Sequence, residues 1–483
     1  MTDSSRQAGK VVTLPSGAWY DEAEMPLEFP PGWEVHRCAP RDGPAMGDDE
    51  IARAFERPVG TSTIRDLAAG KTSAVIAVDD LTRPTPAHRF LRPLIDDVVR
   101  GGIPRDRIRI LMGAAAHRPM DREEMARKLG AEVLAQHPPI MHDFLGPDIR
   151  RVGWLLGGPV DLNRHLLDAE LRILTGGVIP HAETGFGGGA KMVVPGLAGR
   201  RTIAHFHGAL PPRPAGQIES DGRRLDRRAW AEAVARHVGI HAAVCAVMNS
   251  RRELAGLHVG DVVGAHRAAA RQARDICLTV VPRDVAENVD IVVAGAYPLD
   301  TDPIQMGKSL AAGLKLGAPL TIVLNRASDG ILYHGMGMGC GIDPARLLRN
   351  LPAWLRPRNF GTWLRGMLTA ARQPMLAARF CYFTLNYLSY ERFQQLAAAR
   401  AAQAPAAPAT DGNGQANPLV VSRGIPAWGF RRKYPKGRLY PDWPALMRDI
   451  AGRFAHARVL VFPCAPMQLL EIEGDRDSPG AAR

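Results

Sequence analysis

Residues 74–86 read AVIAVDDLTRPTP, an apolar run that is followed at once by two carboxylates, an arginine and two prolines. Such a run, continuous and not alternating, is typical of a strand buried on both faces of a parallel sheet. Pro84 disfavours a helical continuation, so we expect the polar residues on a turn at the strand's carboxyl end. Five further runs have the same character, at residues 108–113, 171–177, 291–300, 320–325 and 458–463.

Helical patterns lie between these runs, at residues 88–102, 122–136 and 262–276. Strands that alternate with helices predict an α/β fold with mainly parallel sheets. Ligands of such sheets bind beyond the carboxyl ends of the strands, where the polar clusters of this sequence fall. A length of 483 residues favours two domains. We expect α/β domains over residues 1–280 and 281–483, with the active site in the cleft between them.

Composition narrows the classes of function. The chain carries 61 basic and 49 acidic residues, a formal charge of +12, which suits acidic small molecules or reflects a basic proteome. Aromatic residues make up only 6% of the chain and are not interleaved with basic ones in the way that stacks bases, so we do not expect nucleic-acid binding. Six widely spaced cysteines predict reduced thiols. No signal peptide or membrane-spanning apolar run is visible, so the expected compartment is the cytoplasm.

Two polar clusters follow the first two predicted strands. Asp80 and Arg83 lie in the first turn, and arginine is suited to binding a carboxylate or phosphate with two hydrogen bonds. A local ion pair that stabilises the turn is the alternative. His117 follows the second strand in GAAAHRP (113–119), among small residues that leave the imidazole open for acid–base chemistry. A purely structural histidine is the alternative there.

The strongest signal is PHAETGFGGGAKMVVPG at residues 180–196. Its glycines let backbone amides approach an anion closely. The spacing does not match the P-loop signature, because Lys191 is not followed by serine or threonine. Lys191 is therefore a lysine in an anion-binding site and a candidate for covalent attachment. A glycine-rich turn with a solvated lysine is the alternative.

Two further patterns complete the set. His205 and His207 could both bind one metal only on an extended segment, so we expect one ligand and one bystander. Because the sequence has no HExxH motif and no Cys/His cluster, a metal here would need ligands from a cofactor. Gln305 and Lys308 share one face at a predicted helix start with Asp302 as N-cap, which attracts anions. Ordinary helix-start chemistry is the alternative.

In order and spacing, the blocks DxxRP, GxxxHRP, PHx3GFxGGxKx3PG and QxxK resemble the lactate racemase family, over roughly residues 10–345. In that family the lysine of the glycine-rich block is joined through a thioamide to the nickel-pincer nucleotide, a nickel pyridinium-3,5-bisthiocarboxylic acid mononucleotide. The resemblance implies that Lys191 is the covalent anchor and that Gly188 and Gly189 contact the cofactor. It implies His207 as the nickel ligand, with His205 as the fallback.

The resemblance also implies an isomerase activity, the racemisation or epimerisation of a small 2-hydroxy acid by reversible hydride transfer through a 2-keto acid. His117 and His181 would be the two acid–base histidines, one for each enantiomer. The residues that would orient the substrate carboxylate and the cofactor are Asp80, Arg83, Gln305 and Lys308. Cofactor-synthesis enzymes would be partners during maturation, and a homo-oligomer is compatible with the sequence.

Two other classes of function compete with this one. A catalytically silent relative would bind an organic acid or nucleotide, but all the matched catalytic positions are filled. A nicotinamide-dependent dehydrogenase would need a GxGxxG fingerprint, which the sequence lacks. Lactate, malate, an aromatic lactate, a hydroxyglutarate or a sugar acid would each suit the implied site.

The sequence departs from the family in two places. Ile304 stands where lactate racemase carries an aromatic residue, and the segment at about 351–420 has no recognised counterpart. Within that segment, residues 356–392 are basic and aromatic, and we expect them to cover the cleft or an oligomer interface in preference to contacting a membrane. Residues 397–418 are rich in alanine and proline, which predicts a flexible linker.

Overall fold

The computed structural model of the chain describes residues 10–117, 120–301, 303–328, 418–425, 430, 434 and 436–474. The first of two six-stranded sheets consists of β4 (Ala74–Asp79), β5 (Ile108–Gly113), β6 (Ile140–Met141), β9 (Leu171–Gly177), β12 (Ala242–Met248) and β13 (Leu254–Gly260). The second consists of β3 (Trp33–Arg37), β15 (Ile291–Gly295), β16 (Leu320–Leu324), β17 (Leu419–Val421), β18 (Arg438–Tyr440) and β19 (Ala457–Phe462).

The strand orders are β13–β12–β9–β4–β5–β6 and β18–β17–β16–β15–β19–β3. All neighbours are parallel except β12 and β13. The predicted α/β class with mainly parallel sheets is therefore confirmed. Each predicted apolar run contains a strand, because a run that is apolar at every position can be buried on both faces of a sheet.

Smaller pairs of strands flank the sheets. The antiparallel pairs are β1 (Val11–Ser16) with β2 (Ala23–Glu28), β7 (Ile149–Leu155) with β8 (Gly158–Asn163), and β10 (Pro180–His181) with β11 (Gly185–Phe186). The strands β14 (Leu278–Val281) and β20 (Leu469–Ile472) form a parallel pair.

The helices fill the connections. They are α1 (Asp48–Glu56), α2 (Ile64–Ala68), α3 (Leu91–Arg100), α4 (Arg122–Leu129), α5 (Ala131–Gln136), α6 (Arg164–Leu167), α7 (Arg200–Gly208), α8 (Arg227–His237), α9 (Gly264–Ile276), α10 (Arg283–Ala286), α11 (Met306–Leu316) and α16 (Trp443–Ile450). The single helix predicted over 122–136 is two helices, because Gly130 has a φ of 86° and interrupts the helical path. Short 3₁₀ turns are η1 (Ala87–Arg89), η2 (Arg105–Arg107), η3 (Gly189–Met192), η4 (Pro303–Gln305) and η5 (Ala451–Arg453).

The second sheet is covered on both faces. Ile291 and Val293 of β15 belong to an apolar cluster that includes the β1–β2 hairpin and α16. Val292 and Ala294, which point the other way, belong to a cluster that includes α10 and α11. Successive side chains of a strand face opposite sides, so this uninterrupted apolar run serves two cores at once.

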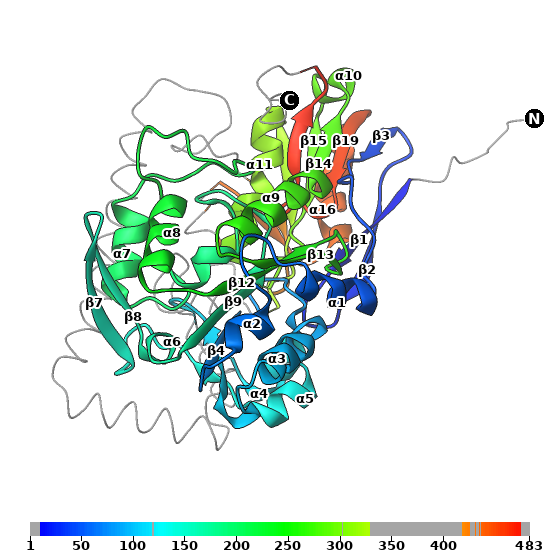
Figure 1. The fold of residues 1–483 in the computed structure, drawn as a ribbon. Helices are drawn as coiled ribbons and strands as arrows, with labels where there is room; N and C mark the ends of the chain where they lie inside the picture. Colours follow the sequence, from blue (N-terminus) through cyan, green and yellow to red (C-terminus); the bar gives the residue numbers. More distant parts are fainter. Residues whose placement is uncertain are drawn as a thin grey trace, which may run out of the picture.

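The boundary predicted at residue 280 does not match the pairing of the first strands. β3 is parallel to β19, and Figure 1 shows the two strands side by side, although they are far apart in the sequence. Leu14 and Leu27 of the β1–β2 hairpin pack in the cluster of the second sheet. Residues 11–37 therefore join the C-terminal half, because strand pairing and burial depend on tertiary contacts and not on position along the chain.

The tip of the β1–β2 hairpin reaches back to the first sheet's helices. The ring of Trp19 stacks against the guanidinium of Arg252 at 3.9 Å, and the Lys128 ammonium lies 5.1 Å from the same ring centroid. Asp300, which follows β15, accepts hydrogen bonds from the amides of Gly17 (2.7 Å) and the next residue (3.1 Å). The tip thus contacts both halves of the structure.

None of the helices within the described ranges is long and apolar enough to span a bilayer. Residues 351–417 of the predicted insertion, with the 356–392 segment and the linker up to 417, lie outside the described residues. The predicted N-cap Asp302 and the side chain of Ile304 also lie outside them.

Candidate active site

The predicted polar clusters follow the carboxyl ends of β9, β4 and β5, which are adjacent in the first sheet. Asp80 comes directly after β4, His117 lies four residues beyond β5, and His181 lies four residues beyond β9. Neighbouring parallel strands end at one edge of a sheet, so these residues share the edge where α/β proteins bind ligands.

Asp80 and His117 form a close pair. The Asp80 Oδ2 atom lies 2.6 Å from His117 Nδ1, and Asp80 Oδ1 accepts hydrogen bonds from the amide and hydroxyl of Thr82. Burial by itself would raise the pKa of Asp80, but the charge and hydrogen bond of His117, with Arg83, hold it well below its usual range. The carboxylate is therefore ionised, and it orients His117 with Nε2 pointing away from Asp80.

A buried lysine supports this turn. The Lys128 ammonium is 2.7 Å from Asp79 Oδ1 and donates hydrogen bonds to the carbonyl oxygens of Asp80 (3.1 Å) and Arg83 (3.0 Å). Its side chain is fully buried, and burial lowers its pKa even though Asp79 opposes the shift. Lys128 thereby ties α4 to the backbone that carries Asp80 and Arg83.

His181 and Lys191 are in direct contact, with Lys191 Nζ 2.8 Å from His181 Nε2. The Nδ1 atom of His181 accepts a hydrogen bond from the amide of Glu183 at 3.2 Å. A neutral imidazole accepts at only one nitrogen, so Nε2 carries the proton and donates it toward Lys191. Burial and the cations Lys191, Lys308 and Arg83 lower the pKa of His181 well below its usual value.

Lys308 of α11 reaches this edge from the second sheet. Burial and the nearby charge of Arg83 lower its pKa to about 7, and Glu183 partly opposes the shift. Gln305, at the N-cap of the same helix, is buried. Residues predicted from separate blocks of sequence therefore meet where the two halves face each other.

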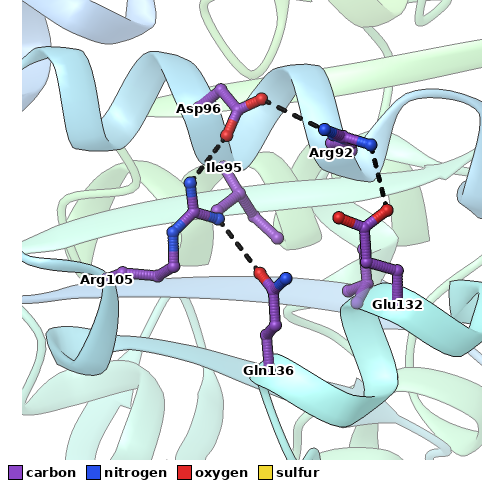
Figure 2. A pocket seen from close by; sticks show the side chains of 7 residues that line it. Arg92, Ile95, Asp96, Arg105, Glu132 and Gln136 are labelled. Carbon is purple, nitrogen blue, oxygen red and sulfur yellow. Dashed lines mark hydrogen bonds and ion pairs between the residues drawn. The ribbon is translucent and has the colours of Figure 1, made fainter.

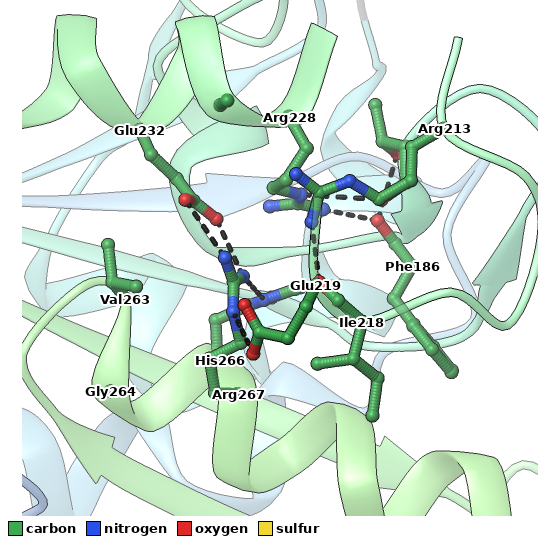
Figure 3. Close-up of polar contacts among 12 residues, drawn as sticks. Phe186, Arg213, Ile218, Glu219, Arg228, Glu232, Val263, Gly264, His266 and Arg267 are labelled. Carbon is green, nitrogen blue, oxygen red and sulfur yellow. Dashed lines mark hydrogen bonds and ion pairs between the residues drawn. The ribbon is translucent and has the colours of Figure 1, made fainter. Parts of the chain in front are cut away.

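The glycine-rich loop rests on a buried arginine, as Figure 3 shows. Arg228 of α8 donates hydrogen bonds to the carbonyl oxygens of Phe186, Gly187 (3.3 Å) and Gly188 (3.0 Å), and also to that of Thr184 (3.4 Å). On the neighbouring helix α9, His266 Nε2 lies 2.9 Å from the Gly187 carbonyl oxygen. Helices α8 and α9 therefore both hold the loop by contacts to its backbone carbonyl oxygens.

Gly188 and Gly189 have positive φ angles of 68° and 58°. A Cβ atom at Gly188 would lie 2.9 Å from the carbonyl oxygen of Gly177, and one at Gly189 would lie 2.9 Å from the ring of His266. Both positions therefore require glycine for backbone conformation and close packing. Their contact with a cofactor stays a prediction.

The two histidines of α7 face different surroundings. The His205 ring packs 5.1 Å from the Trp230 ring centroid, and a Cβ on Gly158 would collide with it. The Nδ1 atom of His207 lies 3.1 Å from the Ile203 carbonyl oxygen, so Nδ1 carries the proton and Nε2 keeps its lone pair. That Nε2 atom is 3.7 Å from Glu183 Oε2 in the glycine-rich block.

A separate hollow of about 290 Å³ lies between α3 and α5. Its charged side chains pair with one another, since Arg92 contacts Asp96 and Glu132, and Arg105 contacts Asp96 and Gln136 (Figure 2). None of the residues predicted for the active site lines this hollow.

Comparison with known proteins shows which family the chain resembles. Residues 20–216 match the family described as the lactate racemase N-terminal domain. Lactate racemases from Lactiplantibacillus plantarum and Thermoanaerobacterium thermosaccharolyticum are 29% identical over 272 residues and 28% identical over 274 residues. Over residues 20–216 the chain is therefore similar to the lactate racemase family. Each alignment covers 55% of this chain and 62% of the relative, less than two thirds of its length.

The likeness in fold extends beyond the stretch that aligns in sequence. The structure of the lactate racemase apoprotein from Thermoanaerobacterium thermosaccharolyticum matches with a TM-score of 0.64 at 18% identity, covering 96% of this chain and all of that one. A crystal structure of a Thermotoga maritima protein matches with a TM-score of 0.56 at 16% identity, covering 89% of this chain and all of that one. At these identities the likeness shows the fold.

Three residues of this lactate racemase relative escaped the sequence-based prediction. Glu183 lies inside the glycine-rich block but was assigned no role, although it faces His207 and both site lysines. Lys128 and Arg228 each follow an arginine in a helical segment, where basic residues are usually solvated. Only the tertiary contacts reveal that both are buried beneath the site.

We predict that Lys128→Met lowers the free energy of unfolding by about 3–5 kcal/mol, because it leaves the buried Asp79 carboxylate without its cation. The double variant Lys128→Met with Asp79→Asn should recover most of that loss, since no buried charge remains unpaired. Urea unfolding at pH 7 measures both, with the exposed Lys315→Met as control. A single variant within about 1 kcal/mol of the parent protein would show that the pair contributes little.

Carboxylate binding should weaken as pH rises through 7. Lys308 has a pKa of about 7, so it is charged below that pH and loses its charge above it. Glycolate affinity, measured by calorimetry between pH 6 and 8.5, should fall by up to about tenfold per pH unit above 7, with uptake of a proton on binding. Lys308→Met should bind more weakly and lose this dependence. An unchanged pH profile in that variant would assign the effect to another group.

Proposed function

We propose that this chain is a racemase or epimerase of a small 2-hydroxy acid, and that it uses a nickel-pincer nucleotide attached to Lys191. The observation that carries the proposal is that two histidines with separate supports follow β5 and β9 at the same edge of the first sheet. His117 is held by the ionised Asp80, and His181 is hydrogen-bonded to Lys191. Inversion at a carbinol carbon needs an acid–base group for each enantiomer, and the two histidines meet that need.

The residues present fit the proposed cofactor. Lys191 offers an amine that accepts a hydrogen bond from His181, and such an amine has the lone pair that attachment requires. His207 presents Nε2 with its lone pair while Nδ1 is bound to a backbone carbonyl, the arrangement usual for a metal-ligating histidine. Within the described ranges, no group of three or more His, Cys, Asp or Glu side chains could hold a metal. Further ligands would therefore come from the cofactor.

The chain's own residues would perform the proton transfers and hold the substrate. When bound, the nickel-pincer nucleotide supplies a reversible acceptor for the hydride at the carbinol carbon. Arg83 and Lys308 would bind the substrate carboxylate, a role suited to cations near a buried site. His117 would take the hydroxyl proton of one enantiomer, with Asp80 stabilising the imidazolium, and His181 would serve the other enantiomer.

Protein produced together with the cofactor-synthesis enzymes should interconvert the enantiomers of a 2-hydroxy acid and contain about one nickel per chain. Peptide mass spectrometry should find the adduct on the peptide that contains Lys191. Lys191→Arg should lack both the adduct and the activity. Full activity with unmodified Lys191 would refute the proposed attachment.

The two α7 histidines provide a matched pair of variants. His207→Ala should lose nickel while the adduct on Lys191 persists, because only the metal ligand is removed. His205→Ala, which removes a ring packed on Trp230, should keep nickel. His117→Ala should also keep nickel and lose about 10²–10⁴-fold in turnover. Metal analysis that shows loss in His205→Ala and retention in His207→Ala would reverse the ligand assignment.

A further inference from the structure

Arg228 is a buried cation with an unusual set of partners. Its side chain is fully buried, and its polar contacts are four backbone carbonyl oxygens of residues 184–188. Among the described residues it forms no ion pair with a carboxylate. By contrast, Arg213 pairs with Asp226, and Arg267 pairs with Glu232. A buried guanidinium without a direct ion pair is costly even with the Glu232 charge nearby, so its retention beneath this loop calls for a role.

The position of Arg228 decides which hydrogen-bond acceptors remain available to the Lys191 amine. The carbonyl oxygens of residues 184, 186, 187 and 188 accept hydrogen bonds from the guanidinium, and within the described residues the Lys191 amine bonds to none of them. In the part of the chain that the structure describes, the polar contact of Lys191 Nζ is His181 Nε2. Because His181 accepts from the Glu183 amide at Nδ1, it donates at Nε2, and Lys191 must accept with a lone pair. An ammonium has no lone pair to offer.

We propose that Arg228 is a positioning residue for Lys191: by drawing the loop carbonyls to itself, it leaves the lysine amine hydrogen-bonded to His181 and ready to react as a nucleophile. This role deepens the proposed attachment at Lys191 and rests on it for its biological purpose. The reactivity of the amine can nevertheless be measured without cofactor, nickel or racemase activity.

Electrostatics act in the same direction as the geometry. Burial lowers the pKa of Arg228 to about 10, so the guanidinium remains charged at neutral pH. Burial, followed by the charges of Arg83 and Arg228, lowers the pKa of Lys191 well below its usual value. Glu183 opposes the shift without reversing it.

Methyl acetyl phosphate is a suitable probe, because it is a small anionic acyl donor and the site is rich in cations. The Lys191 nitrogen attacks the acetyl carbon, the N–C bond forms, and the bond from that carbon to the phosphate oxygen breaks. Methyl phosphate leaves, and the proton lost from nitrogen passes to solvent. Peptide mass spectrometry then gives the acetylation rate of Lys191 against the exposed Lys315 in the same sample.

The pH profile of this rate separates charge from position. The midpoint pH of the profile reports the pKa of the Lys191 amine and therefore the charge around it. The plateau rate at high pH reports how accessible and well oriented the neutral amine is on the loop. In the parent protein, Lys191 should react at pH 7 about tenfold or more faster than Lys315. Arg228→Gln should raise the midpoint and lower the plateau. Arg228→Lys keeps the charge but reaches fewer carbonyls, so it should lower the plateau several-fold with little change in midpoint.

Arg267→Gln is the matched control, because Arg267 is a largely buried arginine on the next helix. Among the described residues its guanidinium contacts Glu219, Glu232 and the His266 ring and none of the loop carbonyls. It should leave the Lys191 profile within about twofold of the parent. Thermal unfolding checks that each variant is folded. If Arg228→Gln does not fold, the acetylation profile of Arg228→Lys tests the proposal by itself. A folded Arg228→Lys with the parent plateau would overturn the proposal, as would an equal loss in Arg267→Gln. Either result leaves the proposed racemase activity untouched, since that activity is tested by the adduct and by nickel.

Discussion

The buried ammonium of Lys128 connects three parts of this molecule. It extends from α4 to the carbonyl oxygens of the turn after β4, pairs with Asp79, and lies against Trp19 at the tip of the β1–β2 hairpin. Desolvating a lysine is unfavourable, and the close carboxylate and two carbonyls offset that cost. The hairpin packs on the second sheet, so one interaction helps to place the Asp80 turn relative to both halves.

The site built on this frame has more positive than negative charge. Arg83, Lys191 and Lys308 influence one another electrostatically, and Glu183 is the carboxylate that opposes them. The Asp80 carboxylate is already engaged by His117. Such a site favours an anionic ligand, and it lowers the pKa values of Lys191 and His181, which favours the neutral forms that act as nucleophile and base.

Much of the fold could be predicted from the sequence, because short, uninterrupted apolar runs are typical of strands that are buried on both faces of a parallel sheet. All six runs contain strands of the two sheets. The site clusters around Asp80, His117 and the glycine-rich block could be found for a related reason, since polar residues directly after such strands must lie at the ligand-binding edge. The pairing of β3 with β19 could not be foreseen, because a short strand near the start of a chain carries no local sign of its distant partner.

The sequence by itself determined the strands, the order of the polar clusters and the resemblance to the lactate racemase family. Through that resemblance it ranked His207 before His205, and it assigned no role to Lys128, Glu183 or Arg228. Only the tertiary structure shows what surrounds each of these side chains, because their neighbours come from distant parts of the sequence. The helix α7 turns one imidazole toward Trp230 and the other toward Glu183. A lysine and an arginine that look solvated in sequence become buried supports only when strands and loops from distant positions close around them.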